Sequence, residues 1–385
     1  MISETRRTFL YAASALVMAG VVAGGAHADH VWKIPMMESF SGAAADWGAD
    51  MFTGVVVAQE MINAKGGIRG HKVEFYKADA PYDDVPQSVT MFKKLARDKD
   101  TPLIFDGGAT SVIAAVHDLA AENKIPIYAF SSGGVWKLPS FNPWVFRSLP
   151  LAHTGLPVIL PQAQKKWNIK KAAMIYTHDD EAMVNDRVVY LKEAKKLGIE
   201  ILELSHKAKE TDYSAQLTRA KGFNPDAFFV MQQAFDGGIM VGQARDMGMN
   251  QPVIGTLGIS NPDYWKLAKG KVGETVLYGF YNPADPRPFV QEFREAYKVK
   301  FGKYPTAWAH LTADGAFVTA KILTDSKHPL TRDGIRAAFS ETKAVESISG
   351  IFGWNGGSGD ASRDTLVIVR WDNGELVPIP PNYFN

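Results

Sequence analysis

The feature that most constrains this sequence is the alternation of two kinds of apolar segment. Short runs rich in β-branched and aromatic residues alternate with longer runs whose apolar residues recur at helical spacing. This alternation is typical of βαβ units around a mainly parallel sheet. One series of such segments occupies residues 32–130 and a second occupies residues 156–255, so the sequence predicts an α/β fold with two similar lobes.

The residue pattern gives bounds for each predicted element. In the first series, strands are predicted over 32–37, 72–77, 103–105 and 126–130, and helices over 46–64, 85–97 and 111–122. In the second series, strands are predicted over 172–176, 200–204, 227–231 and 252–255, and helices over 156–166, 183–197, 213–221 and 239–247. A strand over 276–281 precedes three further helices, over 289–301, 311–324 and 331–339. Alternating residues 365–371 followed by Asn373-Gly374 predict a hairpin.

Residues 1–28 have the pattern of an export signal. Arg6 and Arg7 supply the positive start, an Ala- and Gly-rich apolar run follows, and Ala26 and Ala28 match a cleavage site. The broken apolar run and the cleavage site argue against a retained membrane anchor. The paired arginines are similar to a twin-arginine signal, although a Sec signal explains them equally well. We therefore expect a periplasmic protein whose signal peptide is removed.

The composition excludes several classes of function. With no cysteine, the chain has no disulfides, thiolate metal sites or cysteine nucleophiles. The 42 basic and 41 acidic residues balance, which gives no support for a nucleic-acid partner. The segment His178-Asp179-Asp180-Glu181 could suggest a metal, but acidic residues ahead of a predicted helix are better explained by capping. No hydrolase elbow, phosphate loop or dinucleotide motif is present, so we expect no metal, no cofactor and no catalytic residues.

Several motifs near the start of the sequence share their order and spacing with a known family. They are Glu38-Ser39-Phe40-Ser41-Gly42, Asp46-Trp47-Gly48, Phe52-Thr53-Gly54 and Ile62-Asn63-Ala64-Lys65-Gly66-Gly67-Ile68-Arg69-Gly70. On these motifs the sequence resembles the type I periplasmic binding proteins, and within them the leucine/isoleucine/valine-binding-protein-like family. Weaker agreement continues in Gly107-Gly108-Ala109-Thr110-Ser111, Ser131-Ser132-Gly133, Phe146-Arg147-Ser148, Gln243-Ala244-Arg245 and Gly350-Ile351-Phe352.

The resemblance implies two Rossmann-like lobes with parallel sheets, joined by a three-crossing hinge, with the ligand held between the lobes. Applied to this sequence, the crossings would fall near Ser148, Tyr281 and Val345. Lobe 1 would then comprise residues 29–148 plus 282–345, and lobe 2 residues 149–281 plus 346–385.

The resemblance also implies a function, namely the periplasmic substrate-binding component of an ABC importer. Its expected partners are a small carboxylate ligand and the permease subunits in the inner membrane, and the protein itself is expected to be a monomer. A ligand-sensing module of a membrane receptor would share the whole fold. A secreted α/β hydrolase or dehydrogenase is the enzyme alternative, which the absence of catalytic motifs disfavours.

Ligand-binding residues are expected where strands end, because ligands bind outside the carboxyl ends of a parallel sheet. The resemblance matches Thr110 and Ser111 to carboxylate-binding positions, although a hydroxyl here could simply cap the helix. It also matches Ser131, Ser132 and Gly133 to a second loop whose backbone groups face the ligand. In the same family the position of Trp47 often supplies an aromatic wall.

The second lobe departs from the pattern of amino-acid-binding members. Leu257 stands where those proteins have an acidic partner for the ligand's ammonium group, and Ala182 and Gln233 replace two aromatic residues. With Phe235 nearby, this predicts apolar walls and a carboxylate ligand without an α-amine, such as an aromatic or bulky apolar acid. A shift in the alignment would instead bring in one of three acidic residues and favour an apolar amino acid; these residues are Asp236, Asp179 and Glu181.

Overall fold

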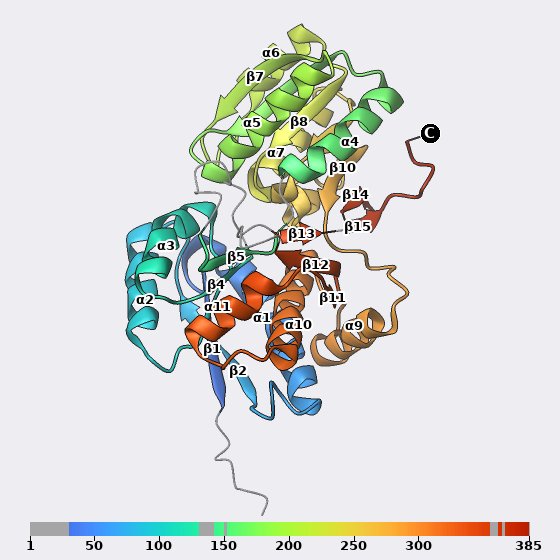
Figure 1. The fold of residues 1–385 in the computed structure, drawn as a ribbon. Helices are drawn as coiled ribbons and strands as arrows, with labels where there is room; N and C mark the ends of the chain where they lie inside the picture. The colour runs from blue at the N-terminus through green and yellow to red at the C-terminus, as the bar shows by residue number, and fades with distance from the viewer. Residues whose placement is uncertain (1–30, 131–141, 150–151, 355–360, 364–365, 385) are drawn as a thin grey trace, which may run out of the picture. The chain divides into compact units, whose positions relative to one another are not determined.

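A computed structural model describes residues 31–130, 142–149, 152–354, 361–363 and 366–384. The predicted export signal lies outside these residues. The first sheet consists of five parallel strands in the order β2-β1-β3-β4-β5. They are β1 (Trp32–Glu38), β2 (Val73–Asp79), β3 (Ile104–Asp106), β4 (Ile127–Ala129) and β5 (Val145–Arg147). Helices connect the first four strands, namely α1 (Ala45–Ala64), preceded by the 3₁₀ turn η1 (Gly42–Ala44), α2 (Val85–Arg97) and α3 (Thr110–Glu122) (Figure 1).

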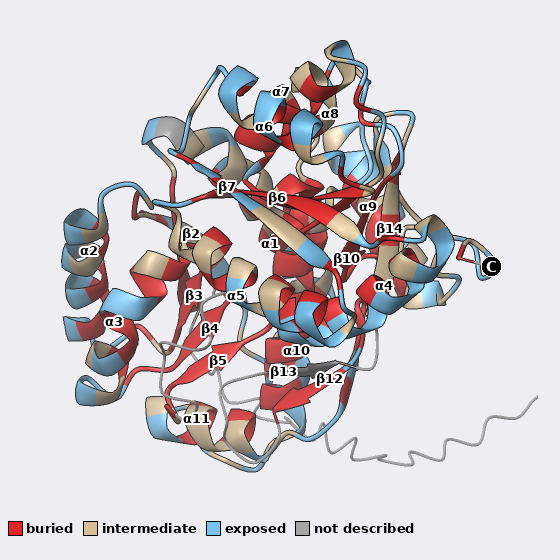
Figure 2. Cartoon of the chain, turned by 90° about the horizontal axis from the view of Figure 1, so that it is seen from above, coloured by how far each residue is buried: buried red, intermediate tan, exposed pale blue. Residues whose placement is uncertain are grey.

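The central strands of this sheet are buried on both faces, which explains why they appear in the sequence as unbroken apolar runs. Every residue of β3, β4 and β5 is buried, and Figure 2 shows these strands in the buried colour while the outer faces of α2 and α3 are exposed. The start of α2 follows the expected chemistry, since Asp84 caps it by accepting a hydrogen bond from the Gln87 N–H, with Pro86 in the first turn.

The second sheet has seven strands in the order β15-β14-β10-β9-β8-β6-β7. Five of them are parallel, namely β6 (Lys171–Thr177), β7 (Glu200–His206), β8 (Ala227–Met231), β9 (Val253–Gly255) and β10 (Thr275–Gly279). The other two, β14 (Val367–Asp372) and β15 (Glu375–Pro378), are antiparallel and form the predicted hairpin. Its turn residues Asn373 and Gly374 both have positive φ, as a two-residue hairpin requires.

The helices of the second series lie between these strands along the chain. They are α4 (Ala152–Trp167), α5 (Glu181–Lys196), α6 (Ser214–Phe223), α7 (Ala234–Asp246) and α8 (Asp263–Leu267), with the 3₁₀ turn η2 (Leu257–Ser260) before α8. The predicted bounds agree at both ends for α2 and β8, but α7 begins five residues before the predicted start. Its glycines, Gly237 and Gly238, are needed because added Cβ atoms would clash with Ile259 and Tyr264.

Three helices follow the second series, namely α9 (Pro288–Phe301), α10 (Ala307–Asp325) and α11 (Arg332–Glu341). Helix α10 packs closely against α1, although the two are far apart in the sequence. The close approach depends on Gly54 of α1, because a Cβ at this position would lie 1.9 Å from the carbonyl oxygen of Ala309. The motif residue Gly54 is therefore explained by helix packing.

A third, small antiparallel sheet was not predicted; it consists of β11 (Val345–Ser347), β12 (Gly350–Trp354) and β13 (Ala361–Arg363). Trp354 packs against Tyr128, Phe146 and Phe339, and its indole N–H donates to the Arg147 carbonyl at 3.1 Å. These contacts join β12 to the first sheet and to α11. We therefore propose that the third crossing lies after Trp354, and not near Val345 as the sequence suggested.

Candidate ligand-binding site

The loop after β1 is held by a carboxylate at the end of the neighbouring strand. Asp79 accepts hydrogen bonds from the N–H groups of Phe40 and Ser41 at 2.8 and 3.1 Å and from the Ser41 hydroxyl at 2.6 Å. This loop leads into the helix that carries Trp47. The Trp47 ring is half-buried and packs edge-on against Trp308, with 5.3 Å between the ring centroids. The ring centroid of Trp308 lies 5.8 Å from that of Phe280. Trp47 thus belongs to an aromatic row that reaches the segment after β10.

The loop after β3 presents the start of α3. Its first residue is Thr110, which is buried, and Ser111 is half-buried. The N-cap residue is Ala109, and among the described residues no side chain caps this helix. The capping explanation for the two hydroxyls is therefore wrong. The backbone N–H groups of the first turn have no side-chain cap, an arrangement that favours an anion. Three further predicted ligand-binding residues, Ser131, Ser132 and Gly133, lie outside the described residues.

On the second sheet, Asp180 joins two strand-end loops. It caps α5 by accepting from the N–H groups of Ala182 and Met183 at 2.9 and 3.3 Å, and its other oxygen accepts from the Gln233 amide at 2.9 Å. The capping interpretation of this acidic segment is thus confirmed. In the described part of the chain, no group of three or more histidine and carboxylate side chains is placed to hold a metal ion.

The exposed Gln233, a predicted ligand-binding residue, therefore fixes the start of α7 relative to α5. Phe235, in the first turn of α7, is 42% exposed and is available as a wall. Ala182, the other position that differs from the family's aromatic residues, is half-buried.

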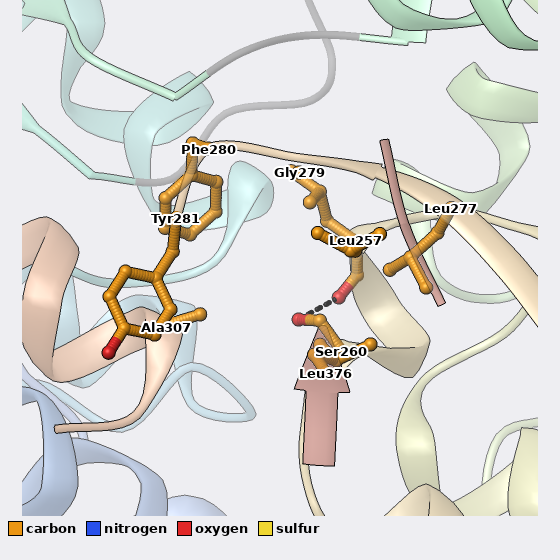
Figure 3. Close-up of a pocket in the computed structure, with 9 residues that line it drawn as sticks. Leu257, Ser260, Leu277, Gly279, Phe280, Tyr281, Ala307 and Leu376 are labelled. Carbon is orange, nitrogen blue, oxygen red and sulfur yellow. Dashed lines mark hydrogen bonds between the residues drawn. The ribbon is translucent and has the colours of Figure 1, made fainter. Parts of the chain in front are cut away.

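Leu257 is buried and lines a small hollow together with Phe280, Tyr281 and six other residues (Figure 3). The hollow has a volume of about 260 Å³ including its open side, which is below the range of typical small-molecule sites. The backbone of Leu257 is fixed in part by Ser260, whose hydroxyl donates to the Leu257 carbonyl at 2.6 Å. Because Phe280 also contacts Trp308, apolar side chains lie in a continuous row from this hollow to Trp47.

A buried polar network, which the sequence did not reveal, lies behind the loops of the second sheet. His206, the last residue of β7, is within hydrogen-bond distance of the Thr177 hydroxyl at 3.2 Å and of the Gln232 amide nitrogen at 2.7 Å. Burial lowers the pKa of His206. The Tyr213 hydroxyl donates to Asp236 at 3.0 Å, and burial raises the pKa of Asp236 to about 6. The sequence contains one indication of this network, namely that a polar residue ends or directly follows each of the buried strands involved.

The first sheet ends in two buried carboxyl groups that the sequence also did not assign to a site. Glu38 is the last residue of β1 and Asp106 the last residue of β3, and neither is exposed to solvent. Burial raises the pKa of Glu38 to about 8 and that of Asp106 to about 7. Both groups adjoin the Gly107-Gly108 turn that leads to Thr110.

Two α/β sheets with loops at the carboxyl ends of parallel strands define the architecture of a ligand-binding protein. The family model of periplasmic binding proteins matches residues 31–375. The chain therefore belongs to the periplasmic binding protein family. Its members and structural neighbours are solute-binding proteins and not enzymes, so the enzyme alternative is excluded. Within the described residues, no helix is long and apolar enough to cross a membrane.

Similar proteins share nearly the whole length of the chain. The Leu/Ile/Val-binding protein homolog 7 of Brucella suis is 24% identical over 392 residues and covers 96% of both chains. The leucine-binding protein LivK of Thermotoga maritima has a TM-score of 0.80 at 21% identity, over 91% of this chain and 99% of the other. An ABC transporter solute-binding protein of Rhodopseudomonas palustris, in complex with 3,4-dihydroxybenzoic acid, has a TM-score of 0.76 at 22% identity, over 91% and 96%.

Proposed function

We propose that this protein is the periplasmic substrate-binding component of an ABC importer and that its ligand is a carboxylate without an α-amine, with an aromatic or bulky apolar body. The observation that carries the ligand class is the use of acidic side chains on the second sheet. The residue matched to the ammonium partner of amino-acid binders is the buried Leu257. Three nearby carboxylates, Asp179, Asp180 and Asp236, accept internal hydrogen bonds.

Three acidic residues near the strand ends of the second sheet accept hydrogen bonds that hold the fold. Asp180 accepts from two backbone N–H groups and the Gln233 amide, Asp236 accepts from the Tyr213 hydroxyl, and Asp179 accepts from the Ala208 N–H at 2.8 Å. A ligand ammonium would have to compete with these donors. A desolvated ammonium without a partner is costly, so these contacts favour a ligand that lacks one.

The first sheet supplies the complementary feature, a place for an anion. Thr110 and Ser111 begin α3 and neither caps it. The Val112 N–H donates to the Ala109 carbonyl at 2.9 Å, whereas the N–H groups of Thr110 and Ser111 have no side-chain acceptor among the described residues. A carboxylate placed here would gain charge-assisted hydrogen bonds and a favourable interaction with the helix dipole. The proposal also includes Ser131, Ser132 and Gly133, and it assigns Trp47, Phe235 and Leu257 as walls around the apolar body of the ligand.

The relatives support two ligand classes. The Rhodopseudomonas structure contains an aromatic acid, which agrees with the proposed class. The names of the Brucella and Thermotoga relatives favour a second candidate, a branched-chain or other apolar amino acid. A permease in the inner membrane is the proposed partner for either ligand, and a receptor would take its place if the protein serves in sensing.

Calorimetric titration with matched pairs of ligands tests the proposal. The pairs are phenylalanine with 3-phenylpropanoate and leucine with 4-methylpentanoate, accompanied by benzoate and 3,4-dihydroxybenzoate. We expect the acids to bind and the amino acids to bind at least tenfold more weakly, because Leu257 at the matched position cannot pair with their ammonium group. Benzyl alcohol, which lacks the carboxylate, is the control and should not bind. Tight binding of an amino acid but not of its deaminated analogue would contradict the proposal.

A further inference from the structure

Glu38 and Asp106 lie side by side at the carboxyl ends of neighbouring parallel strands. In the pairing of β1 with β3, Asp106 is opposite Met37, the residue before Glu38. Each carboxyl group uses one oxygen to shape the loop that follows its strand. Glu38 Oε1 accepts from the Ser39 N–H at 2.7 Å, and Asp106 Oδ1 accepts from the Gly108 N–H at 2.8 Å. Within the described residues, the buried atoms Glu38 Oε2 and Asp106 Oδ2 have no hydrogen-bond partner.

The Glu38 carboxyl group occupies the space that a side chain at position 107 would need. A Cβ on Gly107 would lie 2.0 Å from Glu38 Oε2, and a Cβ on Gly48 of α1 would lie 2.9 Å from Glu38 Cγ. The carboxyl group is therefore enclosed between α1 and the Gly107-Gly108 turn. This turn carries the chain from β3 to Thr110, so its position sets that of the proposed carboxylate site.

Among the described residues, no cation acts on the pKa of either carboxyl group. The charged neighbours of Glu38 are carboxyl groups, namely Asp106 of β3 and Asp79, which is opposite Glu38 in the pairing of β1 with β2. On the side of α1 the neighbours are the uncharged residues Gly48 and Met51. Burial raises the pKa of both carboxyl groups, and repulsion by Asp106 adds to the rise at Glu38.

We propose that Glu38 and Asp106 are positioning residues of the ligand site, which hold the Gly107-Gly108 turn and remain neutral while an anionic ligand is bound. A neutral carboxyl group adds no charge beside the turn, whereas an ionised one places negative charge under it. This inference rests on the proposed function in one respect, the anionic nature of the ligand. Its consequence is that affinity for a carboxylate falls as the pH rises and the pair loses its proton.

The protonation of the pair is measured without ligand from the Gly108 amide, because this N–H donates directly to Asp106. In glycine-selective ¹⁵N spectra of the full-length protein between pH 5 and 9, we expect its resonance to titrate in the neutral to alkaline range. Asp106→Asn should abolish the titration, whereas Glu38→Gln should leave the midpoint in the same range, because Glu38 has the higher pKa and is still neutral where Asp106 ionises. A wild-type midpoint below about pH 5, where ordinary carboxyl groups titrate, or a titration that persists in Asp106→Asn, would overturn the inference.

Benzoate binding measures the effect on the ligand site. We expect the wild-type affinity to fall by up to about tenfold per pH unit above the midpoint, and the affinity of Glu38→Gln to vary less. Glu122→Gln, which removes an exposed charge at the far end of α3, is the control and should follow the wild type. Failure of benzoate to bind would count against the proposed ligand and leave the glycine titration to decide the inference. If the Gly108 resonance titrates below about pH 5 while benzoate still binds, the inference is rejected and the proposed function is not.

Discussion

At the scale of single residues, hydroxyl groups at helix starts have two different roles in this protein. Thr306 and Thr331 cap α10 and α11, since their side chains accept from the N–H groups of Ala309 and Gly334 at 3.1 and 3.2 Å. Thr110 and Ser111 stand one and two residues inside α3 and cap nothing. The same residue type therefore stabilises the fold at two helices, and we propose that it binds the ligand at the third.

This difference predicts a separation of binding from stability. Thr110→Val and Ser111→Ala should each weaken binding of the carboxylate ligand by roughly ten- to hundredfold, because a hydrogen bond to a charged group is worth about 1.5 to 3 kcal/mol. Thermal unfolding of both variants should stay close to that of the wild type. Thr331→Ala is the control, with a loss of about 1 kcal/mol of stability and unchanged affinity. Wild-type affinity in both site variants would reject the assignment.

The residues that the sequence did not assign to a site share one physical property, dependence on a distant partner. The topology of parallel sheets predicts which loops face a ligand, and Trp47, Thr110 and Ser111 follow from that rule with the resemblance. The raised pKa of Glu38 depends on burial and on Asp106, which lies 68 positions further along the chain. Neither factor is visible in a local pattern.

At the scale of elements, one arginine ties together two segments between the sheets. Arg287, directly before α9, forms a two-pronged ion pair with Asp285 and donates to the carbonyl oxygens of Ser347 and Ile348 at 2.8 and 3.1 Å. It thereby links the segment that follows β10 to the turn between β11 and β12. The planar guanidinium group makes all these contacts at once, which an ammonium group does not.

Arg287→Lys should therefore destabilise the protein by about 1 to 2 kcal/mol, since the contacts to two carbonyl groups are lost. Hydrogen exchange should speed up at the turn over residues 347–350 more than in β8. Arg370→Lys is a matched control, because Arg370 is paired with Asp372 at the surface; such exposed pairs contribute less than about 1 kcal/mol. If the two substitutions lower the stability equally, Arg287 contributes no more than an arginine in an exposed ion pair.

Element prediction succeeded where the local signal was long or chemically specific. The hairpin at Asn373-Gly374 was predicted because its turn residues require positive φ. Helix α2 was predicted from its apolar spacing with both bounds correct, and in the structure a capping residue and a proline mark its start. Strand β5 has three residues and the β11–β13 sheet has strands of three to five. The equally short β3, β4 and β9 were predicted from the alternation of strands and helices. Strand β5 and the β11–β13 sheet lie outside that alternation, and the partners that bury them are distant in the sequence.

At the scale of the whole molecule, the family fold predicts a hinge that closes on the ligand. The aromatic row of Trp47, Trp308 and Phe280 connects α1 and α10 to the segment after β10, which is one of the proposed crossings. A ligand held against this row contacts both the first sheet's helices and the crossing segment. Binding should therefore alter the arrangement of the two lobes.

Small-angle scattering of the free and the ligand-saturated protein tests this expectation. The radius of gyration should decrease on saturation with the acid that binds most tightly in calorimetry, because both lobes gain contacts with it. The control is the same protein with benzyl alcohol, which should leave the radius unchanged. Tight binding of the acid with no change in radius would count against a closing hinge.

The contact of Gly54 with Ala309 also has a consequence for the order in which the chain folds. Residues 31–130 supply four of the five strands of the first sheet, together with α1. The helix that covers α1 is α10, which is synthesised some 240 residues later. Contacts at such separation form slowly, because a long loop must close first. A fragment that ends before residue 307 would leave the apolar face of α1 that packs against α10 in water. We therefore expect that the first third of this protein does not fold stably by itself.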